Sequence, residues 1–262
     1  MHIVHACILG IVEGVSEFLP ISSTGHLILA ARILKVAQSD FVKSFEIIIQ
    51  LGAILSVIVL YYKSLLWDWK IIKRLCLAFI PAGIIGLLFY KLIKKFLLGN
   101  SLVVFWSLML GGILIIIFEL LHREKENATD DVTSISYKQA IFIGLFQAIA
   151  IIPGVSRSAA TIIGGLLLGL KRRTIVEFSF LLAIPTMLAA AVLDLSKNAA
   201  LFSHEQFLSL GVGFITSFIV ALLAIKFLLA FIQKHSFIVF GIYRILIALL
   251  FLLALGLPGM SH

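Results

Sequence analysis

The chain has 262 residues, of which 61% are hydrophobic and only 13% are charged, and its mean hydropathy is +1.16. A soluble domain carries about 25% charged residues, so this composition excludes a soluble globular domain and favours an integral membrane protein. The net charge of +8 is typical of Lys and Arg in cytoplasmic loops. No basic run is interleaved with aromatic residues, so we expect no nucleic acid partner.

The first element, residues 3–37, is apolar but is interrupted by a polar stretch from Glu13 to His26. Neither half is long enough to cross a bilayer, because a transmembrane helix needs about 20 apolar residues. The pattern predicts two short helices that enter and leave on the same side, with a polar tip between them. Such a re-entrant hairpin is tolerated only where neighbouring protein covers its backbone.

Full-length spans follow at Phe45–Tyr62, Leu75–Tyr90 and Leu102–Leu121. Because these apolar runs are continuous, they predict membrane helices rather than the alternating strands of a barrel. Residues 122–138 form the only extended polar stretch of the sequence. We interpret this stretch as a linker loop between two halves of the chain.

The second half of the chain repeats the pattern of the first. An offset that aligns Glu13 with Gln147 also aligns Ser22 with Ser156. One hairpin and three spans give each copy an odd number of membrane crossings, so the second copy is expected to be inverted relative to the first. Chance alignment of apolar residues is the alternative explanation.

We therefore expect an all-α integral membrane protein with one membrane domain over residues 1–262, containing about six transmembrane helices plus two re-entrant helical hairpins. The first inverted-topology repeat is predicted at 1–121, the linker at 122–138 and the second repeat at 139–262. Inverted repeats place a site at their interface, near the bilayer midplane. Lys and Arg are more frequent in the loops of one side, which include residues 63–74, so we expect those loops in the cytoplasm and the N-terminus outside.

Two carboxylates open the first polar cluster. Glu13 and Glu17 are four residues apart, and in a helix this spacing puts both side chains on one face. Two neighbouring carboxylates can hold a divalent cation, or they can share a proton and act as acid and base. The alternative is a pair of interfacial glutamates that face water, although two unpaired glutamates are costly in an apolar helix.

Hydroxyl groups and a histidine complete this cluster. Pro20 ends the preceding helix, and Ser22, Ser23 and Thr24 would then open the next helix with hydroxyl and N–H groups aimed at an anion. Helix capping explains one of the three hydroxyls equally well. We expect His26 to act as a nucleophile or as a general acid or base, with a packing role as the alternative.

The second cluster centres on Arg157. A guanidinium is always charged, and its planar fork matches phosphate oxygens. Inside a membrane it needs an anion, so Arg157 is predicted to bind a phosphate, with a structural bridge to Glu13 or Glu17 as the alternative. Further donors surround it in the sequence: Ser156, Ser158 and Thr161.

Other polar residues are weaker signals. Glu46 and Gln50 lie one turn apart in a predicted span and are expected to support substrate binding. Glu119 and Arg244 lie near span ends or alone, and snorkelling or structural pairing is the simpler interpretation.

Together, the residues of the two polar clusters indicate phosphoryl-transfer chemistry. Hydrolysis of a phosphoanhydride needs charge neutralisation, a positioned nucleophile and a proton source. Arg157 and the hydroxyls supply donors, the glutamate pair supplies a metal or proton site, and His26 or Ser23 supplies the nucleophile. A membrane transporter or a flippase of a polyprenyl phosphate is the alternative, because inverted repeats with hairpins are common in transporters.

The residues 13–26 and 153–161 resemble the two signatures of the bacterial undecaprenyl-diphosphate phosphatase family, of the bacitracin-resistance type. Residues 45–52 and 177–185 are also similar to that family. The resemblance implies a hydrolase that converts undecaprenyl diphosphate to undecaprenyl phosphate and inorganic phosphate, which recycles the lipid carrier for peptidoglycan synthesis and confers bacitracin resistance. It also implies a divalent cation, Mg²⁺ or Ca²⁺.

The same resemblance implies a multi-pass protein of the bacterial plasma membrane with a site that faces the periplasm or outer side. Its partners would be a polyprenyl diphosphate substrate and membrane lipids, and a homodimer is an open alternative. The implied catalytic residues and their hydroxyl neighbours are Glu13, Glu17, Ser23, His26 and Arg157, with Ser22, Thr24, Ser156, Ser158 and Thr161.

Overall fold

The structure is a computed structural model that describes residues 1–37, 39–89, 100–124, 128–198 and 204–255. The described part of the chain holds ten α-helices and one short 3-10 helix. In chain order the elements are α1 (Ile3–Ser16), α2 (Ser23–Ile33), α3 (Asp40–Trp67), α4 (Trp69–Leu88), α6 (Ser101–Leu121), η2 (Val132–Ser134), α7 (Tyr137–Ile149), α8 (Arg157–Leu167), α9 (Arg172–Asn198), α10 (His204–Phe231) and α11 (Ile238–Leu255).

Several helices begin where a polar side chain can accept a hydrogen bond from the first turn. Ser39, Asp68, Asn100 and Ser136 cap α3, α4, α6 and α7 in this way. Such caps satisfy backbone N–H groups that have no partner inside the helix. Because α7 begins at Tyr137, the last residues of the predicted linker belong to a helix rather than to a loop.

The prediction of an all-α integral membrane protein is confirmed. Among the described residues, α3, α4, α6, α9 and α10 are long and apolar enough to cross a membrane. The apolar part of α11, Ile238–Leu253, is shorter. The predicted span Leu75–Tyr90 corresponds to α4, although Tyr90 lies outside the described residues. The count of six spans, the re-entrant course of the hairpins and the inverted repeats stay predictions.

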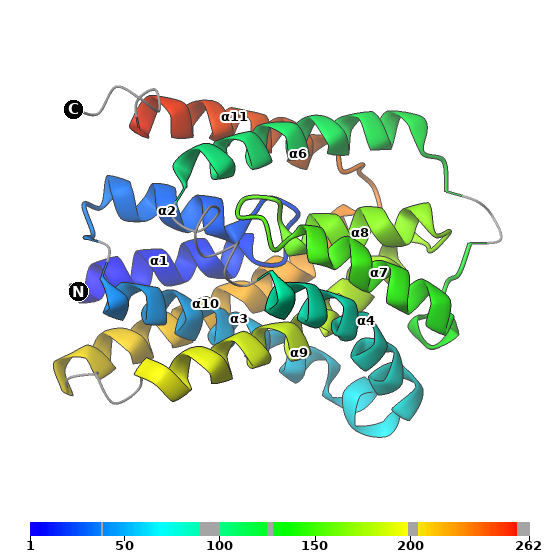
Figure 1. Ribbon diagram of the computed structural model, residues 1–262, viewed down its shortest axis with the longest axis horizontal. Coiled ribbons are helices and arrows are strands. Elements are labelled where there is room, and N and C mark those ends of the chain that lie inside the picture. The colour runs from blue at the N-terminus through cyan, green and yellow to red at the C-terminus, as the bar shows by residue number, and fades with distance from the viewer. Residues whose placement is uncertain (38, 90–99, 125–127, 199–203, 256–262) are drawn as a thin grey trace.

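Two helical hairpins enter the molecule from opposite ends, and their loops meet near its middle (Figure 1). The hairpin of α1 and α2 packs against α10 and α3, whereas the hairpin of α7 and α8 packs against α4 and α9. Helices α3 and α9 contact each other and lie deep, with 44% and 50% of their spans buried, against 22% for α4 and α6. The loop at residues 17–22 is buried throughout, as a polar loop at this depth requires, whereas α1 and α7 still present exposed apolar side chains such as Ile11 and Phe142.

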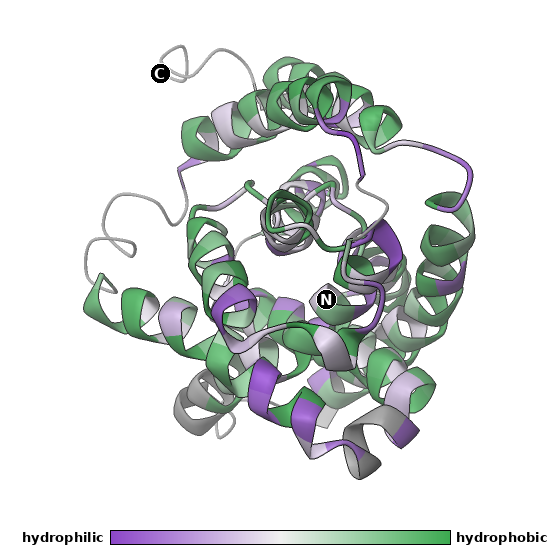
Figure 2. Cartoon of the chain, turned by 90° about the vertical axis from the view of Figure 1, so that its right-hand side faces the viewer, coloured by the Kyte–Doolittle hydropathy of each residue, from purple (hydrophilic) through white to green (hydrophobic). Residues whose placement is uncertain are grey.

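Helices α6 and α11 lie side by side along one edge of the molecule (Figure 1). Viewed from the end where the linker lies, the outer helices are mostly hydrophobic (Figure 2). At that end, Glu119 of α6 is buried, pairs with the guanidinium of Arg172 and accepts the backbone N–H of Phe237 at 2.6 Å. Glu119 therefore has the structural pairing that its place in the sequence suggested.

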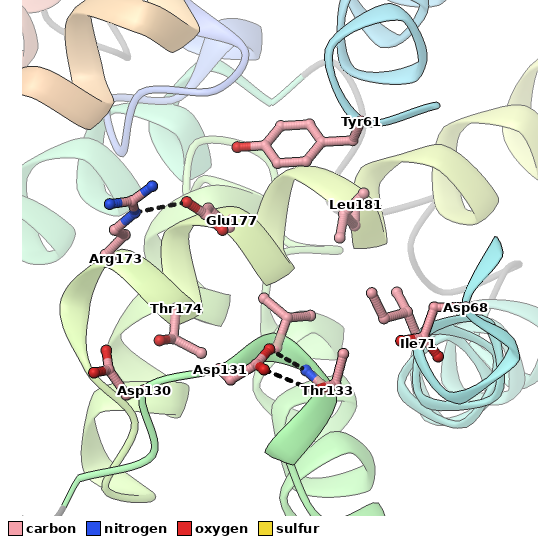
Figure 3. A pocket seen from close by; sticks show the side chains of 11 residues that line it. Tyr61, Asp68, Ile71, Asp130, Asp131, Thr133, Arg173, Thr174, Glu177 and Leu181 are labelled. Carbon is pink, nitrogen blue, oxygen red and sulfur yellow. Dashed lines mark hydrogen bonds and ion pairs between the residues drawn. The ribbon is translucent and has the colours of Figure 1, made fainter. Parts of the chain in front are cut away.

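A cavity of about 410 Å³ lies beside the linker and the start of α9 (Figure 3). Its carboxylates are engaged within the protein: Glu177 pairs with Arg173 at 2.9 Å, and Asp131 accepts hydrogen bonds from the N–H and hydroxyl of Thr133. These two bonds lower the pKa of the Asp131 carboxyl. Asp130 likewise pairs with Lys171 at 2.7 Å. These three carboxylates therefore have partners within the protein, whereas the buried hydroxyl of Thr174 in the same cavity has none.

Close packing of α7 on α4 depends on a glycine. A Cβ built at Gly144 would overlap the carbonyl oxygen of Ala78, whereas no described heavy atom lies within 4 Å of a Cβ at Gly211. We expect Gly144→Ala to lower the free energy of unfolding by about 1–3 kcal/mol, the usual cost of overpacking. Gly211→Ala should leave it unchanged or raise it, because alanine favours helices. Thermal unfolding in detergent measures both, and equal losses would contradict this packing.

Candidate active site

Both hairpins turn at a serine with an unusual backbone. Ser22 has a φ of 73° and Ser156 a φ of 76°, a region that residues other than glycine rarely adopt. Each serine caps the helix that follows it, since Ser22 Oγ accepts from Gly25 N at 3.5 Å and Ser156 Oγ accepts from Ala159 N at 3.2 Å. The two tips thus repeat the same strained turn at positions that the sequence alignment pairs.

Glu17 joins the two tips. Ser23 Oγ donates to Glu17 Oε2 at 2.6 Å, and Arg157 Nη2 donates to Glu17 Oε1 at 3.0 Å. The side chains of Glu17 and Arg157 are 3% and 10% exposed, so this ion pair is shielded from water and its partners depend on each other. The bridge from Arg157 to a glutamate, which the sequence offered as an alternative to phosphate binding, is present.

Arg157 is held by α9 as well. Its Nη1 donates to the Ser179 carbonyl at 2.6 Å, while its buried Nε has no hydrogen-bond partner. The hydroxyl of Thr161 contacts Ser179 Oγ at 2.7 Å, and Ser158 Oγ donates to the Phe18 carbonyl at 2.8 Å. Ser158 and Thr161 are fully buried. The Ser158 hydroxyl joins the two tips, whereas the Thr161 hydroxyl ties α8 to α9.

Glu13 is the least satisfied group of the site. Its side chain is fully buried, and neither carboxylate oxygen accepts a hydrogen bond from a donor group, although the Glu17 carboxyl lies within hydrogen-bond reach. It lies one turn before Glu17, and Glu46 of α3 also acts on it electrostatically. An orphaned buried carboxylate beside a second one fits either a divalent cation or a shared proton. Within the described residues, no group of three or more His, Cys, Asp and Glu side chains is placed to hold a metal.

A cavity of about 100 Å³ lies between the tips. Several predicted site residues from both hairpins line it, and Gln50 of α3 contributes from the side. These lining residues are Glu17, Ser22, Ser23, Thr24, Gln50, Ser156 and Arg157. The structure therefore brings together residues from both hairpins, with the predicted nucleophile Ser23 directly against a carboxylate.

His26 is placed differently. Its ring is turned toward α11, where Nε2 lies 3.0 Å from the Tyr243 hydroxyl and Nδ1 lies 2.7 Å from the Ser22 carbonyl oxygen. It is not among the side chains that line the cavity. Tyr243 carried no signal in the sequence because a tyrosine in an apolar span is usually a packing or interfacial residue.

Arg244, beside Tyr243, was expected to snorkel or to form a structural pair. Snorkelling is wrong, because its side chain is 0% exposed and its guanidinium lies among the backbone carbonyls of the two tips. The spacing of Arg244 in the sequence points to no partner, since those carbonyls belong to segments far away in the chain.

Comparison with known proteins identifies the family of this chain. The sequence profile of the family described as "Bacitracin resistance protein BacA" matches residues 6–250. The undecaprenyl-diphosphatase of Aquifex aeolicus is 58% identical over 246 residues, which cover 94% of this chain and 96% of that protein. The undecaprenyl-diphosphatase of Wolinella succinogenes is 51% identical, over 98% of this chain and 100% of its own length.

A third relative, the undecaprenyl-diphosphatase of a Sulfurihydrogenibium species, is 51% identical over 97% of this chain and 99% of its own length. The matched residues 6–250 contain both hairpins, the cavity between their tips and the two polar residues of α11. A match that extends over nearly the whole chain includes the elements that build the site as well as those that cover it. The chain belongs to the bacitracin resistance protein BacA family.

Proposed function

We propose that this protein hydrolyses undecaprenyl diphosphate to undecaprenyl phosphate and inorganic phosphate, which recycles the lipid carrier for peptidoglycan synthesis. The relatives named undecaprenyl-diphosphatase support this substrate, and the family description supports bacitracin resistance. The observation that carries the proposal is the contact of Glu17 with both Ser23 and Arg157 in a cavity between two buried tips. A nucleophile, a proton acceptor and a cation for phosphate meet there.

In the proposed reaction, Ser23 Oγ attacks the terminal phosphorus and its proton passes to Glu17, which already accepts the hydroxyl at 2.6 Å. The bond from that phosphorus to the bridging oxygen breaks, and undecaprenyl phosphate leaves. Glu17 passes this proton to the departing undecaprenyl phosphate and is ionised again. Water then attacks the phosphoserine and gives one proton to Glu17, which transfers it to Ser23 Oγ as the P–Oγ bond breaks and inorganic phosphate departs. Arg157 neutralises charge on the transferring group. The orientation of His26 toward α11 favours Ser23 over His26 as nucleophile.

Glu13 and Glu17 are the residues that we propose for a divalent cation, Mg²⁺ or Ca²⁺. The support is the fully buried carboxylate of Glu13, which accepts no hydrogen bond from a donor group and lies next to Glu17. When bound, such an ion would neutralise part of the diphosphate charge. Thr24, Ser156 and Gln50 line the cavity and would donate to phosphate oxygens.

We further propose that the site opens to the periplasmic or outer side of the bacterial plasma membrane. The distribution of Lys and Arg supports this orientation, and the pairing of α1 with α10 and of α7 with α4 supports inverted repeats. A transport pathway alone would not require a hydroxyl placed against a carboxylate, so hydrolysis is favoured over a transporter or flippase. Association into a homodimer stays a prediction.

Substitutions at the cavity test the enzymatic proposal. We expect Ser23→Ala, Glu17→Gln and Arg157→Ala each to reduce phosphate release from a polyprenyl diphosphate in detergent at least about a hundredfold, as loss of a transition-state contact does. Ser209→Ala and Arg173→Ala are matched controls away from the cavity and should turn over normally. Normal turnover of Glu17→Gln and Arg157→Ala would refute hydrolysis at this site. Activity retained by Ser23→Ala alone would assign the attack to water.

The cation proposal predicts a dependence on added metal. A chelator should abolish phosphate release from the purified protein, and Mg²⁺ or Ca²⁺ should restore it. Glu13→Gln should weaken the binding of the cation measured directly by calorimetry, since a carboxylate ligand is lost. Full activity in the chelator, together with unchanged metal binding in Glu13→Gln, would refute the cation proposal. That result would indicate that Glu13 and Glu17 share a proton instead.

The orientation is tested by accessibility. Lys70 is an exposed residue in the first turn of α4, next to the turn between α3 and α4, which the proposal places in the cytoplasm. In a background without Cys7 and Cys76, Lys70→Cys should resist a membrane-impermeant thiol reagent in intact cells and react once the cells are opened. Labelling of Lys70→Cys in intact cells would show that this end of α4 faces outside, which is the opposite topology.

A further inference from the structure

Helix α11 brings two neighbouring polar side chains to the site. Tyr243 and Arg244 interrupt an otherwise apolar helix, and the reaction described above uses neither. A charged residue that is kept inside a membrane protein needs compensating partners, so its position calls for an explanation.

Arg244 is bonded to backbone from three segments. Its side chain is 0% exposed, and no described carboxylate pairs with it. Its three nitrogens donate instead to carbonyl oxygens of the first tip, the second tip and α6. These acceptors are Pro20 at 3.3 Å, Gly154 and Val155 at 2.9 Å each, Ser107 at 2.8 Å and Leu108 at 3.5 Å.

The acceptors on the two tips lie just before the strained turns. Pro20 precedes Ser22 by two residues, and Val155 directly precedes Ser156. The planar guanidinium presents five N–H donors in a fixed fork, so it can hold carbonyls of both tips at once in one relative position. A lysine ammonium has three donors on a flexible stem and cannot reproduce this geometry.

Tyr243 contacts the histidine of the first repeat. The Ser22 carbonyl can only accept, so the 2.7 Å contact with His26 Nδ1 places the proton on Nδ1. In the neutral ring Nε2 is then an acceptor, and the Tyr243 hydroxyl donates to it at 3.0 Å. The two rings are also stacked, with centroids 5.5 Å apart and planes 6° from parallel.

We propose that Tyr243 and Arg244 are positioning residues of this site. Arg244 sets the relative position of the two tips, so that Ser23 and Glu17 of one repeat face Arg157 of the other. Tyr243 fixes the ring orientation and the tautomer of His26. This inference rests on the proposed phosphatase function, and α11 becomes the third contributor to the site after the two hairpins.

Double-mutant cycles on the full chain in detergent test the role of Arg244, with inorganic phosphate released from a polyprenyl diphosphate as the readout. Arg244→Lys should lower kcat at least about tenfold with KM changed less than about threefold, because misplaced reacting groups slow the chemical step more than they weaken binding. In an Arg157→Lys background, where the aligned pair is already lost, the same substitution should cost less than about threefold.

Arg74→Lys is the matched control. Arg74 also donates to backbone carbonyls, those of Ile135 and Lys70, but far from the tips, so kcat should be unchanged. A merely structural role of Arg244 would lower activity by the same factor in both backgrounds, and that result would overturn the proposal for Arg244. If thermal unfolding shows that Arg244→Lys does not fold, Arg244→Gln, which keeps two donors without the charge, replaces it in the cycle.

Tyr243→Phe keeps the stacked ring and removes only the hydroxyl. We expect kcat to fall several-fold and the pH–rate profile to change shape, and both effects should vanish in a His26→Gln background. Tyr62→Phe on α3 is the control and should have no effect. An equal loss with and without His26 would overturn the role of Tyr243. A wild-type protein that releases no phosphate would instead refute the proposed function, so the two failures are distinguishable.

Discussion

The site depends on one buried carboxylate that is shared between the two halves of the chain. Glu17 accepts from Ser23 on its own hairpin and from Arg157, which follows it by 140 residues. In a low-dielectric interior each of these charges would be costly alone, and together they compensate each other. The two hairpins bring these groups together, and other helices pack against the hairpins.

Neighbouring helices pack around the two tips and shield their polar groups. The polar loops of the hairpins sit deep because α3 and α9 lie beneath them, and α6 with α11 closes the opposite side. Arg244 then satisfies carbonyl groups that the sharp turns leave without helical partners. The charge of Arg244 and the exposed backbone of the tips are thus two costly features that compensate each other.

Glu13 and Glu119 show why burial of a polar group does not by itself indicate function. Glu119 is buried but pairs with Arg172 and accepts the backbone N–H of Phe237, so its role is structural. Both oxygens of Glu13 accept no hydrogen bond from a donor group while being fully buried. A native structure retains such a group where a ligand, an ion or a proton completes it.

The sequence by itself determined the class of protein, the polar tips and most residues that line the cavity, because apolar length and dense polar clusters are local properties. The spans at Phe45–Tyr62 and Leu102–Leu121 lie inside α3 and α6. Only the tertiary structure decided which groups meet. It turned His26 toward Tyr243, and it placed Arg244 on carbonyls from both tips. Every residue carries a backbone carbonyl oxygen, and an acceptor far along the chain follows no fixed spacing. A single sequence therefore does not reveal a hydrogen bond to such an oxygen.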